Sequence, residues 1–226
     1  MGLTNLPNVA VASLLSVGRH HGVALRVSPS PSVPIAFGRG SEGQLARGTT
    51  ILDGPSGATT TSDEALGPLD VVDVAAGQFH TCVLRSGGQV LCAGANTEGQ
   101  LGRGAGDTSD TTRLAPVAGL TDVVKLGAGS NHTCAIHRDG TLSCWGRDLE
   151  GQVTGVLGGL EESPLAITLP ARALHVAGGL QHTCAILEDR RVYCWGANGS
   201  GQLGNGSTAP VSGLQLVTGL PTRVDP

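Results

Sequence analysis

The segment NHTCAIHRDGTLSCWG, residues 131–146, is the stretch from which the fold can be worked out. Its two cysteines, Cys134 and Cys144, flank a turn-like Arg-Asp-Gly sequence, with a histidine before the pair and Trp-Gly after it. Taken alone, the segment is compatible with a metal site, a redox pair or one hairpin of a larger array. The rest of the chain narrows the choice because the segment recurs.

Three clear copies of one pattern follow each other along the chain, and a degraded copy with His21 at the histidine position precedes them. The repeated histidines are His80, His132 and His182, which are 52 and 50 residues apart. A Gly-Gln pair follows each of them at matching intervals, as Gly99-Gln100, Gly151-Gln152 and Gly201-Gln202. A period near fifty residues is typical of repeat architectures.

Composition favours short strands over helices. The chain has 36 glycines and 12 prolines among 226 residues, while 39% of its residues are hydrophobic. This is too many helix breakers for long helices and too apolar for a disordered chain. Within one unit, residues 132–136 and 141–145 each alternate in the manner of a β-strand.

Four short strands in about fifty residues predict the blade of a β-propeller. We therefore expect an all-β fold, a propeller of four-stranded antiparallel blades, in one repeat domain spanning residues 1–226. The expected units are residues 2–66 (degraded), 67–118, 119–169 and 170–218, with 219–226 beginning a further unit.

The repeated motif Gly-x-x-His-Thr-Cys-Ala, then Cys-Trp-Gly, then Gly-Gln-Leu-Gly resembles the regulator of chromosome condensation repeat. It is most similar to the cysteine-bearing variety of this repeat found in bacterial proteins. The resemblance covers nearly the whole chain and implies a propeller, usually of seven blades, whose faces bind proteins. It does not imply a single activity, because members include a guanine-nucleotide exchange factor and an inhibitor of a β-lactamase.

Four units are fewer than the seven that the resemblance implies. We therefore expect a partial or open propeller with apolar, unpaired faces at both ends of the array. Such faces predict either self-association or a second chain that completes the propeller.

The six cysteines form three pairs that are ten residues apart, and in each pair a three-residue loop is expected at the centre. A loop at Arg138–Gly140, with glycine in the left-handed region, places Cys134 opposite Cys144. Opposed Cα atoms are about 4.5–5.5 Å apart, which suits a disulfide. The third loop has Arg190 where glycine is expected, which leaves its geometry open. The pairs are Cys82/Cys92, Cys134/Cys144 and Cys184/Cys194.

We favour cross-strand disulfides, with buried free thiols and a zinc site as the alternatives. The degraded unit supports bonding, since Val23 and Ala36 replace both cysteines together. Persistent disulfides predict an extracellular or cell-surface protein, with the cytoplasm as the alternative because the first residues lack a basic leader.

The repeated histidines and tryptophans are expected to be structural. Because each histidine has the same neighbours in every unit, we expect each imidazole to bond the backbone where its strand begins, and we predict no catalytic, cofactor or metal residues. Trp145 and Trp195 are expected to pack between blades.

A net charge of −4, with 14% charged residues and scattered basic side chains, argues against nucleic acid as a partner. No apolar run approaches the ~20 residues needed to span a membrane. We therefore predict a non-enzymatic scaffold for protein–protein interaction, with an unknown protein partner and no cofactor.

The alternative function, by family analogy, is a guanine-nucleotide exchange factor for a small GTPase. The predicted contact surface is made by the segments that vary most between units, Thr49–Leu66, Ala105–Arg113 and Gly155–Pro164.

Overall fold

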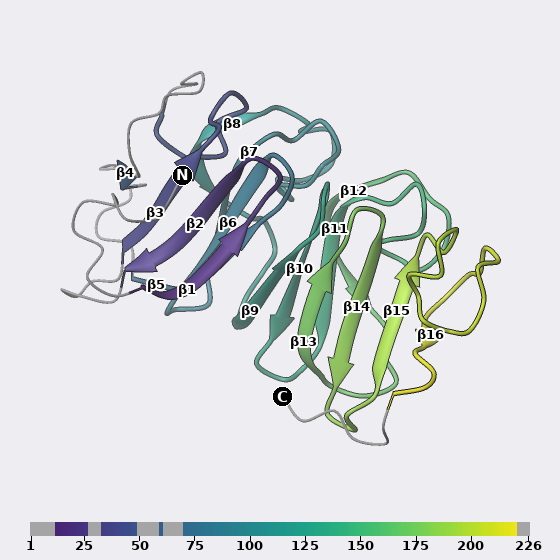
Figure 1. Cartoon of the computed structure of the whole chain (residues 1–226). Coiled ribbons are helices and arrows are strands. Elements are labelled where there is room, and N and C mark those ends of the chain that lie inside the picture. Colours follow the sequence, from purple (N-terminus) through teal and green to yellow (C-terminus); the bar gives the residue numbers. More distant parts are fainter. Residues whose placement is uncertain (1–11, 27–32, 49–58, 61–69, 221–226) are drawn as a thin grey trace.

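The computed structural model describes residues 12–26, 33–48, 59–60 and 70–220, and within these residues the fold is all-β with no helix. Sixteen strands form four antiparallel sheets, and in every sheet the spatial order of the strands follows the chain. The sheets stand side by side as four propeller blades (Figure 1), which confirms the predicted fold class.

Each blade has four strands. Blade 1 contains β1 (Ala12–Val17), β2 (His21–Arg26), β3 (Val33–Gly38) and β4 (Thr59–Thr60). Blade 2 contains β5 (Val71–Ala76), β6 (His80–Arg85), β7 (Val90–Gly94) and β8 (Thr111–Pro116). Blade 3 contains β9 (Val123–Ala128), β10 (His132–His137), β11 (Leu142–Arg147) and β12 (Leu160–Ile167). Blade 4 contains β13 (Ala173–Gly178), β14 (His182–Leu187), β15 (Val192–Gly196) and β16 (Gln215–Leu216).

The hairpin between the second and third strands has the same geometry in blades 2, 3 and 4. Gly88 and Gly140 have φ angles of 83°, and Arg190 takes the same left-handed position with φ 66°. The turn hydrogen bond is likewise shared, since the N–H of Arg190 donates to Leu187 as that of Gly140 donates to His137. The sequence alone does not determine the geometry of the third turn, and the structure shows that Arg190 adopts the left-handed conformation of glycine there.

The first strand of every blade carries a β-bulge at the same place. One extra residue interrupts the pairing with the second strand, and the extra residues are Ser13, Val72, Val124 and Leu174. A bulge changes the direction of the side chain that follows it. The residue after each bulge therefore departs from the regular alternation of side chains between the two faces of the sheet.

The hydrophobic cores lie between blades, and each is built from two neighbouring sheets. Between blades 1 and 2, Val23 and Leu25 pack with Val74 and Leu91. The next two interfaces repeat this arrangement, centred on tryptophans that are fully buried. No core cluster of the described residues belongs to one blade alone.

Within the described residues, no sheet packs on the face of blade 4 that lies opposite blade 3. Along β14 the burial alternates, with Thr183 and Ala185 buried towards blade 3 and His182 and Cys184 half-buried on the other side. The matching strand of blade 3, β10, is buried on both sides.

Candidate functional site

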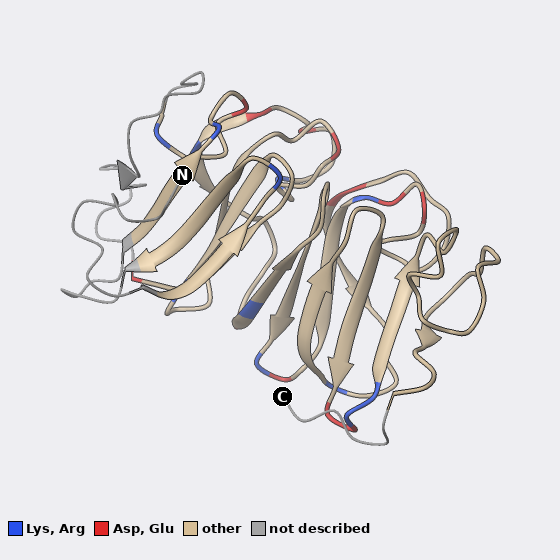
Figure 2. Ribbon diagram, in the orientation of Figure 1, with Lys and Arg blue, Asp and Glu red and all other residues tan. Residues whose placement is uncertain are grey.

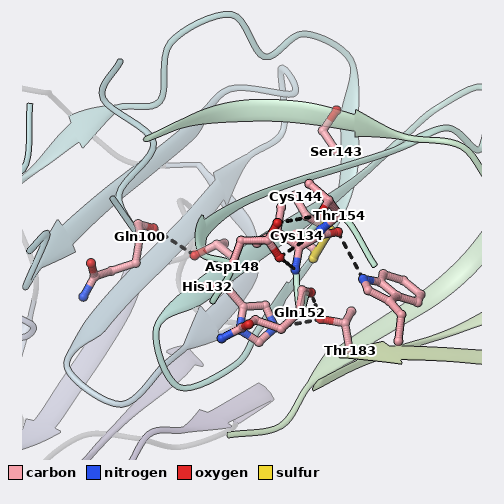
Figure 3. The surroundings of a disulfide bond; sticks show 12 residues. Gln100, His132, Cys134, Ser143, Cys144, Asp148, Gln152, Thr154 and Thr183 are labelled. Carbon is pink, nitrogen blue, oxygen red and sulfur yellow. Dashed lines mark hydrogen bonds between the residues drawn. A yellow bond between two sulfur atoms is a disulfide. The ribbon is translucent and has the colours of Figure 1, made fainter. Parts of the chain in front are cut away.

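The interfaces between blades 2 and 3 and between blades 3 and 4 each contain a hydrogen-bonded relay of three groups. The Nε2 of His132 lies 2.8 Å from Oγ1 of Thr183 on the next blade, and that hydroxyl donates to the carbonyl of Gln152. Figure 3 shows the three residues together beside the Cys134–Cys144 disulfide. Because the hydroxyl gives its proton to the carbonyl, the imidazole donates through Nε2.

The same relay joins blades 2 and 3. Nε2 of His80 is 2.9 Å from Oγ1 of Thr133, which donates to the carbonyl of Gln100 at 3.0 Å. The first half of it also joins blades 1 and 2, where His21 bonds Thr81. The expectation that each histidine bonds backbone where its strand begins is wrong, because the partner is the threonine hydroxyl of the following blade.

Burial keeps these imidazoles neutral. Burial lowers the pKa of His80 to about 3 and the pKa values of His21 and His132 to about 4. A neutral ring with its proton on Nε2 is the form that the relay requires. These histidines therefore connect neighbouring blades.

The glycine three residues before each histidine makes room for its ring. A Cβ on Gly129 would stand 2.1 Å from Cε1 of His132 and 2.6 Å from the carbonyl oxygen of Gly179 on the next blade. Gly77 has the same two neighbours, the ring of His80 and the carbonyl of Gly129. The Gly-x-x-His spacing is thus explained by a close contact that only glycine permits.

The tryptophans and the Gly-Gln pairs complete the interface. Trp145 donates from Nε1 to the carbonyl of Gln100 at 2.9 Å, and Trp195 donates to Val153 at 3.1 Å. Each glutamine also accepts from a backbone N–H two residues before it, which fixes the loop that presents its carbonyl. The glycines before these glutamines, Gly99, Gly151 and Gly201, all have φ angles between 72° and 78°.

All six cysteines are disulfide-bonded in the three pairs Cys82–Cys92, Cys134–Cys144 and Cys184–Cys194. Their Cα atoms are 4.0 to 4.1 Å apart, closer than the range expected for opposed residues. In blade 1, Val23 and Ala36 oppose each other in the corresponding position.

The residues directly after the first-strand bulges make polar contacts between blades that the sequence did not predict. Asp73 of blade 2 accepts from the N–H of Leu126 of blade 3 at 2.8 Å, and burial raises the pKa of its carboxyl. Lys125 of blade 3 lies 3.1 Å from Nδ1 of His175 of blade 4, whose pKa is lowered by burial and by that ammonium group. Asp73, Lys125 and His175 share one repeat position, 7 residues before each repeated histidine. A polar residue that varies between repeats at this position was the sequence signal from which these contacts could have been predicted.

In blades 2 to 4, the loops after the first and third strands lie along one edge of the array, which we call the upper face (Figure 1). Between blades 3 and 4 this face has a pocket of about 720 Å³, lined by apolar side chains that include Val156, Leu157 and Val211. Leu157 is 76% exposed and Val156 56% exposed. This size is typical of small ligand pockets or of sites for one or two side chains.

Acidic side chains lie on the blade 3 side of the pocket. Figure 2 shows Asp and Glu along the loops of blades 2 and 3 at this edge. Glu150 is the charged residue that lines the pocket, and it makes no side-chain hydrogen bond to the described residues. The loop of blade 4, residues 197–214, contains no charged residue. The pocket is therefore apolar with a weakly negative rim.

Two of the three segments predicted to form the contact surface lie at the upper face, and most of the third lies outside the described residues. Gly155–Pro164 contributes to the pocket, and Ala105–Arg113 lies at the same edge, where the N–H of Gly106 bonds the carboxylate of Glu162. Thr49–Leu66 lies outside the described residues except for β4.

No three His, Cys, Asp or Glu side chains in the described ranges are grouped so that they could hold a metal ion. Those ranges also contain no helix long and apolar enough to cross a membrane.

Comparison with known families gives matches over most of the chain. Residues 35–84, 87–136 and 189–226 match the family described as regulator of chromosome condensation (RCC1) repeat, and a second family of that description matches 71–100, 123–152 and 174–202.

Among curated proteins, the mouse (Mus musculus) regulator of chromosome condensation is 37% identical over 156 residues, which is 65% of this chain and 34% of that protein. The dog (Canis lupus familiaris) X-linked retinitis pigmentosa GTPase regulator is 38% identical over 121 residues, which is 52% of this chain and 11% of that protein. The chain thus spans about a third or less of the length of these relatives.

Among solved structures, human WBSCR16 matches with a TM-score of 0.77 and 22% identity, covering 93% of this chain and 54% of that one. Prp20p of Saccharomyces cerevisiae, described with its binding to Gsp1p and histones, matches with a TM-score of 0.76 and 21% identity, covering 94% and 52%. At these identities the likeness concerns the fold.

Proposed function

Because the chain belongs to the regulator of chromosome condensation repeat family, we propose that it is a non-enzymatic protein-binding module whose upper face recognises a polypeptide partner. The observation that carries this proposal is the apolar pocket between the loops of blades 3 and 4. Exposed apolar side chains that line a pocket on a rigid scaffold are typical of protein recognition.

The scaffold around the pocket is rigid. Asp148 is fully buried and accepts from the N–H groups of Val153 and Thr154, which closes the β11–β12 loop on itself. The N–H of Gly213 donates to the carbonyl of Gly155, which joins the loops of blades 3 and 4 beneath the pocket. A binding surface held in this way loses little conformational entropy when a partner binds.

Charge indicates the kind of partner. The β11–β12 loop and the start of β12 carry four carboxylates and no lysine or arginine, and Arg147 at the end of β11 is paired with Glu98 at 3.3 Å. Burial and the nearby Asp148 raise the pKa of Glu161, so this carboxyl lies in an acidic neighbourhood. A segment that presents an apolar side chain beside lysine or arginine matches both features.

Binding of immobilised peptides that vary in apolar and basic content tests this proposal. The full chain is expected to prefer peptides with an apolar residue next to lysine or arginine. Leu157→Asp and Glu150→Lys should each weaken that binding at least tenfold. Leu149→Asp is the matched control, since Leu149 is 43% exposed and does not line the pocket. Equal binding by all three variants would contradict the proposal.

A second candidate is guanine-nucleotide exchange on a small GTPase. Its support is the likeness to a protein named as a GTPase regulator, over about half of this chain. Release of labelled GDP from a panel of small GTPases separates the two functions, because a module without exchange activity leaves the release rate unchanged.

The three disulfides support an extracellular or cell-surface location for this module. Alkylation of the protein in intact cells, before lysis, would test this, and six reactive thiols would indicate a reducing compartment.

A further inference from the structure

A second pocket lies at the edge opposite the upper face, where the hairpins after the second strands of blades 2 to 4 are found (Figure 1). We call this edge the lower face. The lower pocket has a volume of about 450 Å³ and lies between blades 3 and 4. Its walls come from β9, from the segment that leads into β13, and from the β10–β11 and β14–β15 hairpins. No described residue lines both this pocket and the one on the upper face.

Positive charge predominates in the lower pocket. Three basic residues line it, Lys125, Arg138 and Arg172, against one acidic residue, Glu188. This leaves an excess of two positive charges in a chain whose net charge is −4. Basic side chains are visible at this end of blades 3 and 4 in Figure 2. Within the described residues, no ion pair joins Glu188 to any of the three cations.

The cations are held at the pocket with most of their N–H groups unused. Arg172 lies across Gly140, where a Cβ would stand 2.8 Å from its Nε, and its Nη2 donates to the carbonyl of Arg138 at 3.2 Å. The guanidinium of Arg138 makes no hydrogen bond or ion pair with the described residues. The ammonium of Lys125 contacts the ring of His175, 3.1 Å from Nδ1. All three side chains therefore have donors available for a ligand.

The repeat does not explain this charge. At the interface between blades 2 and 3, the positions equivalent to the three basic residues are occupied by Asp73, Ser86 and Asp122. The backbone contacts are nevertheless the same, since the N–H of Arg138 donates to the carbonyl of Asp122 as that of Glu188 donates to Arg172. Basic side chains are thus not needed to join two blades, and their presence at one interface indicates a ligand site.

We propose that the lower pocket binds a phosphate monoester group carried on a small organic body. Arginine donates in a planar fork that fits phosphate oxygens, and lysine adds a third charge-assisted donor. The excess of two charges matches a phosphate monoester, which carries about −1.5 to −2 at pH 7, better than a carboxylate. This site does not depend on the peptide-binding function proposed for the upper face.

The same pocket has room and apolar surface for the organic part of the ligand. Val124, which is 41% exposed, and Leu174 line it beside the cations. Its volume is far larger than a phosphate group alone requires and lies within the range of small-ligand pockets. Inorganic phosphate is therefore expected to bind less tightly than an ester with an apolar group.

Calorimetric titration of the full chain with phenyl phosphate tests the proposal. Inorganic phosphate and phenol each supply one half of this probe, and both should bind several-fold more weakly. Arg138→Gln is expected to weaken the binding of phenyl phosphate about tenfold, as loss of a hydrogen bond to a charged group does. Glu188→Gln should strengthen it, because a negative charge is removed. Arg191→Gln is the matched control, since Arg191 lies on the same face, pairs with Asp189 and does not line the pocket.

Two further ligands complete the test. Benzoate that binds as tightly as phenyl phosphate would overturn the proposal, because the pocket would then take carboxylates. A phosphotyrosine tripeptide identifies the source of the phosphate: tighter binding than phenyl phosphate indicates a phosphorylated polypeptide, and weaker binding indicates a small molecule. Equal affinities of the Arg138→Gln and Arg191→Gln proteins, or an unchanged affinity in Glu188→Gln, would show that the anion does not occupy the lower pocket. The side chain of Arg138 contacts no partner, so its variant is expected to melt at the same temperature as the parent chain.

Discussion

Val23 and Ala36 face each other across β2 and β3 at the position where the other three blades carry a disulfide. Both side chains are fully buried. The double substitution Val23→Cys with Ala36→Cys is therefore expected to form a fourth bond of the same kind. If chain entropy dominates, the bond should raise the free energy of unfolding by about 3 kcal/mol.

Thermal unfolding with and without reductant measures this effect. The double variant should melt several degrees higher only when oxidised, and Val23→Cys alone serves as the control. A melting temperature that does not respond to reduction would show that the two positions are unsuitable.

Arg190 has a positive φ angle that glycine adopts at the same turn in blades 2 and 3. Its Nη1 is also buried without a hydrogen-bond partner. Arg190→Gly is expected to stabilise the protein by about 0.5–1 kcal/mol, because the left-handed conformation costs about 1–2 kcal/mol for a residue with a Cβ and glycine loses more entropy on folding.

Urea unfolding measures the change, with Gly140→Ala as the opposite control. A Cβ at Gly140 would stand 2.5 Å from Cβ of Arg172, so that variant should lose stability. A destabilised Arg190→Gly protein would mean that the arginine side chain makes a larger contribution than the backbone strain.

Acidification should weaken the blade interfaces before most carboxylates titrate. The folded-state pKa values of His21, His80 and His132, about 3 to 4, lie below the ordinary value of 6.5 that an unfolded chain would show. The unfolded chain therefore binds protons first. Stability is complete above pH 6.5 and falls below it by about 1.4 kcal/mol per pH unit for each histidine.

Urea midpoints between pH 7.5 and 5.5 measure this slope. His132→Gln should lower overall stability and make the slope clearly shallower, while His182→Gln, at a half-buried position where burial also lowers the histidine pKa, should make the slope shallower by a smaller amount. Midpoints that do not vary over this range would contradict the neutral, buried state of these rings.

Gly129→Ala should disrupt the interface between blades 3 and 4, because the added methyl group would overlap both the ring of His132 and the backbone of Gly179. We expect a loss of about 1–3 kcal/mol, as for other overpacked cores. Gly199→Ala is the matched control, since nothing lies within 4 Å of a Cβ there. Similar stability of the two variants in chemical denaturation would argue against the steric explanation.

The blade 4 disulfide should be the first of the three to be reduced. Cys184 is half-buried on the open face, whereas Cys82 and Cys134 are at most 2% exposed. Reduction requires access of a thiolate to a sulfur atom. Timed reduction, alkylation and peptide mass spectrometry should therefore detect Cys184 and Cys194 first, and simultaneous reduction of all three bonds would indicate global unfolding instead.

Local patterns in the sequence were enough to predict the repeat, the strands and the hairpin register. The three-residue loop at Arg138–Gly140 fixes which residues oppose each other, so the pairing of Cys134 with Cys144 follows from counting along the chain. Such features depend on residues close in sequence, which is why they could be predicted without knowledge of the packing.

Contacts between blades could not be predicted from residues that are close in sequence. The threonine after each histidine points to the opposite face of its own sheet, so Thr133 and His132 appear unrelated although each completes a relay with a different blade. The pocket on the upper face likewise needs loops from two blades. Its position depends on how the sheets stack, and no pattern within a single unit records that.

Because every core lies between two sheets, removing or adding one complete repeat changes the number of cores by one and leaves the composition of the others nearly intact. Gene duplication and deletion of whole repeats are thus compatible with folding at each intermediate length. Mutations at a single interface, by contrast, must be matched across the two repeats that share it, so neighbouring repeats are constrained to evolve in pairs.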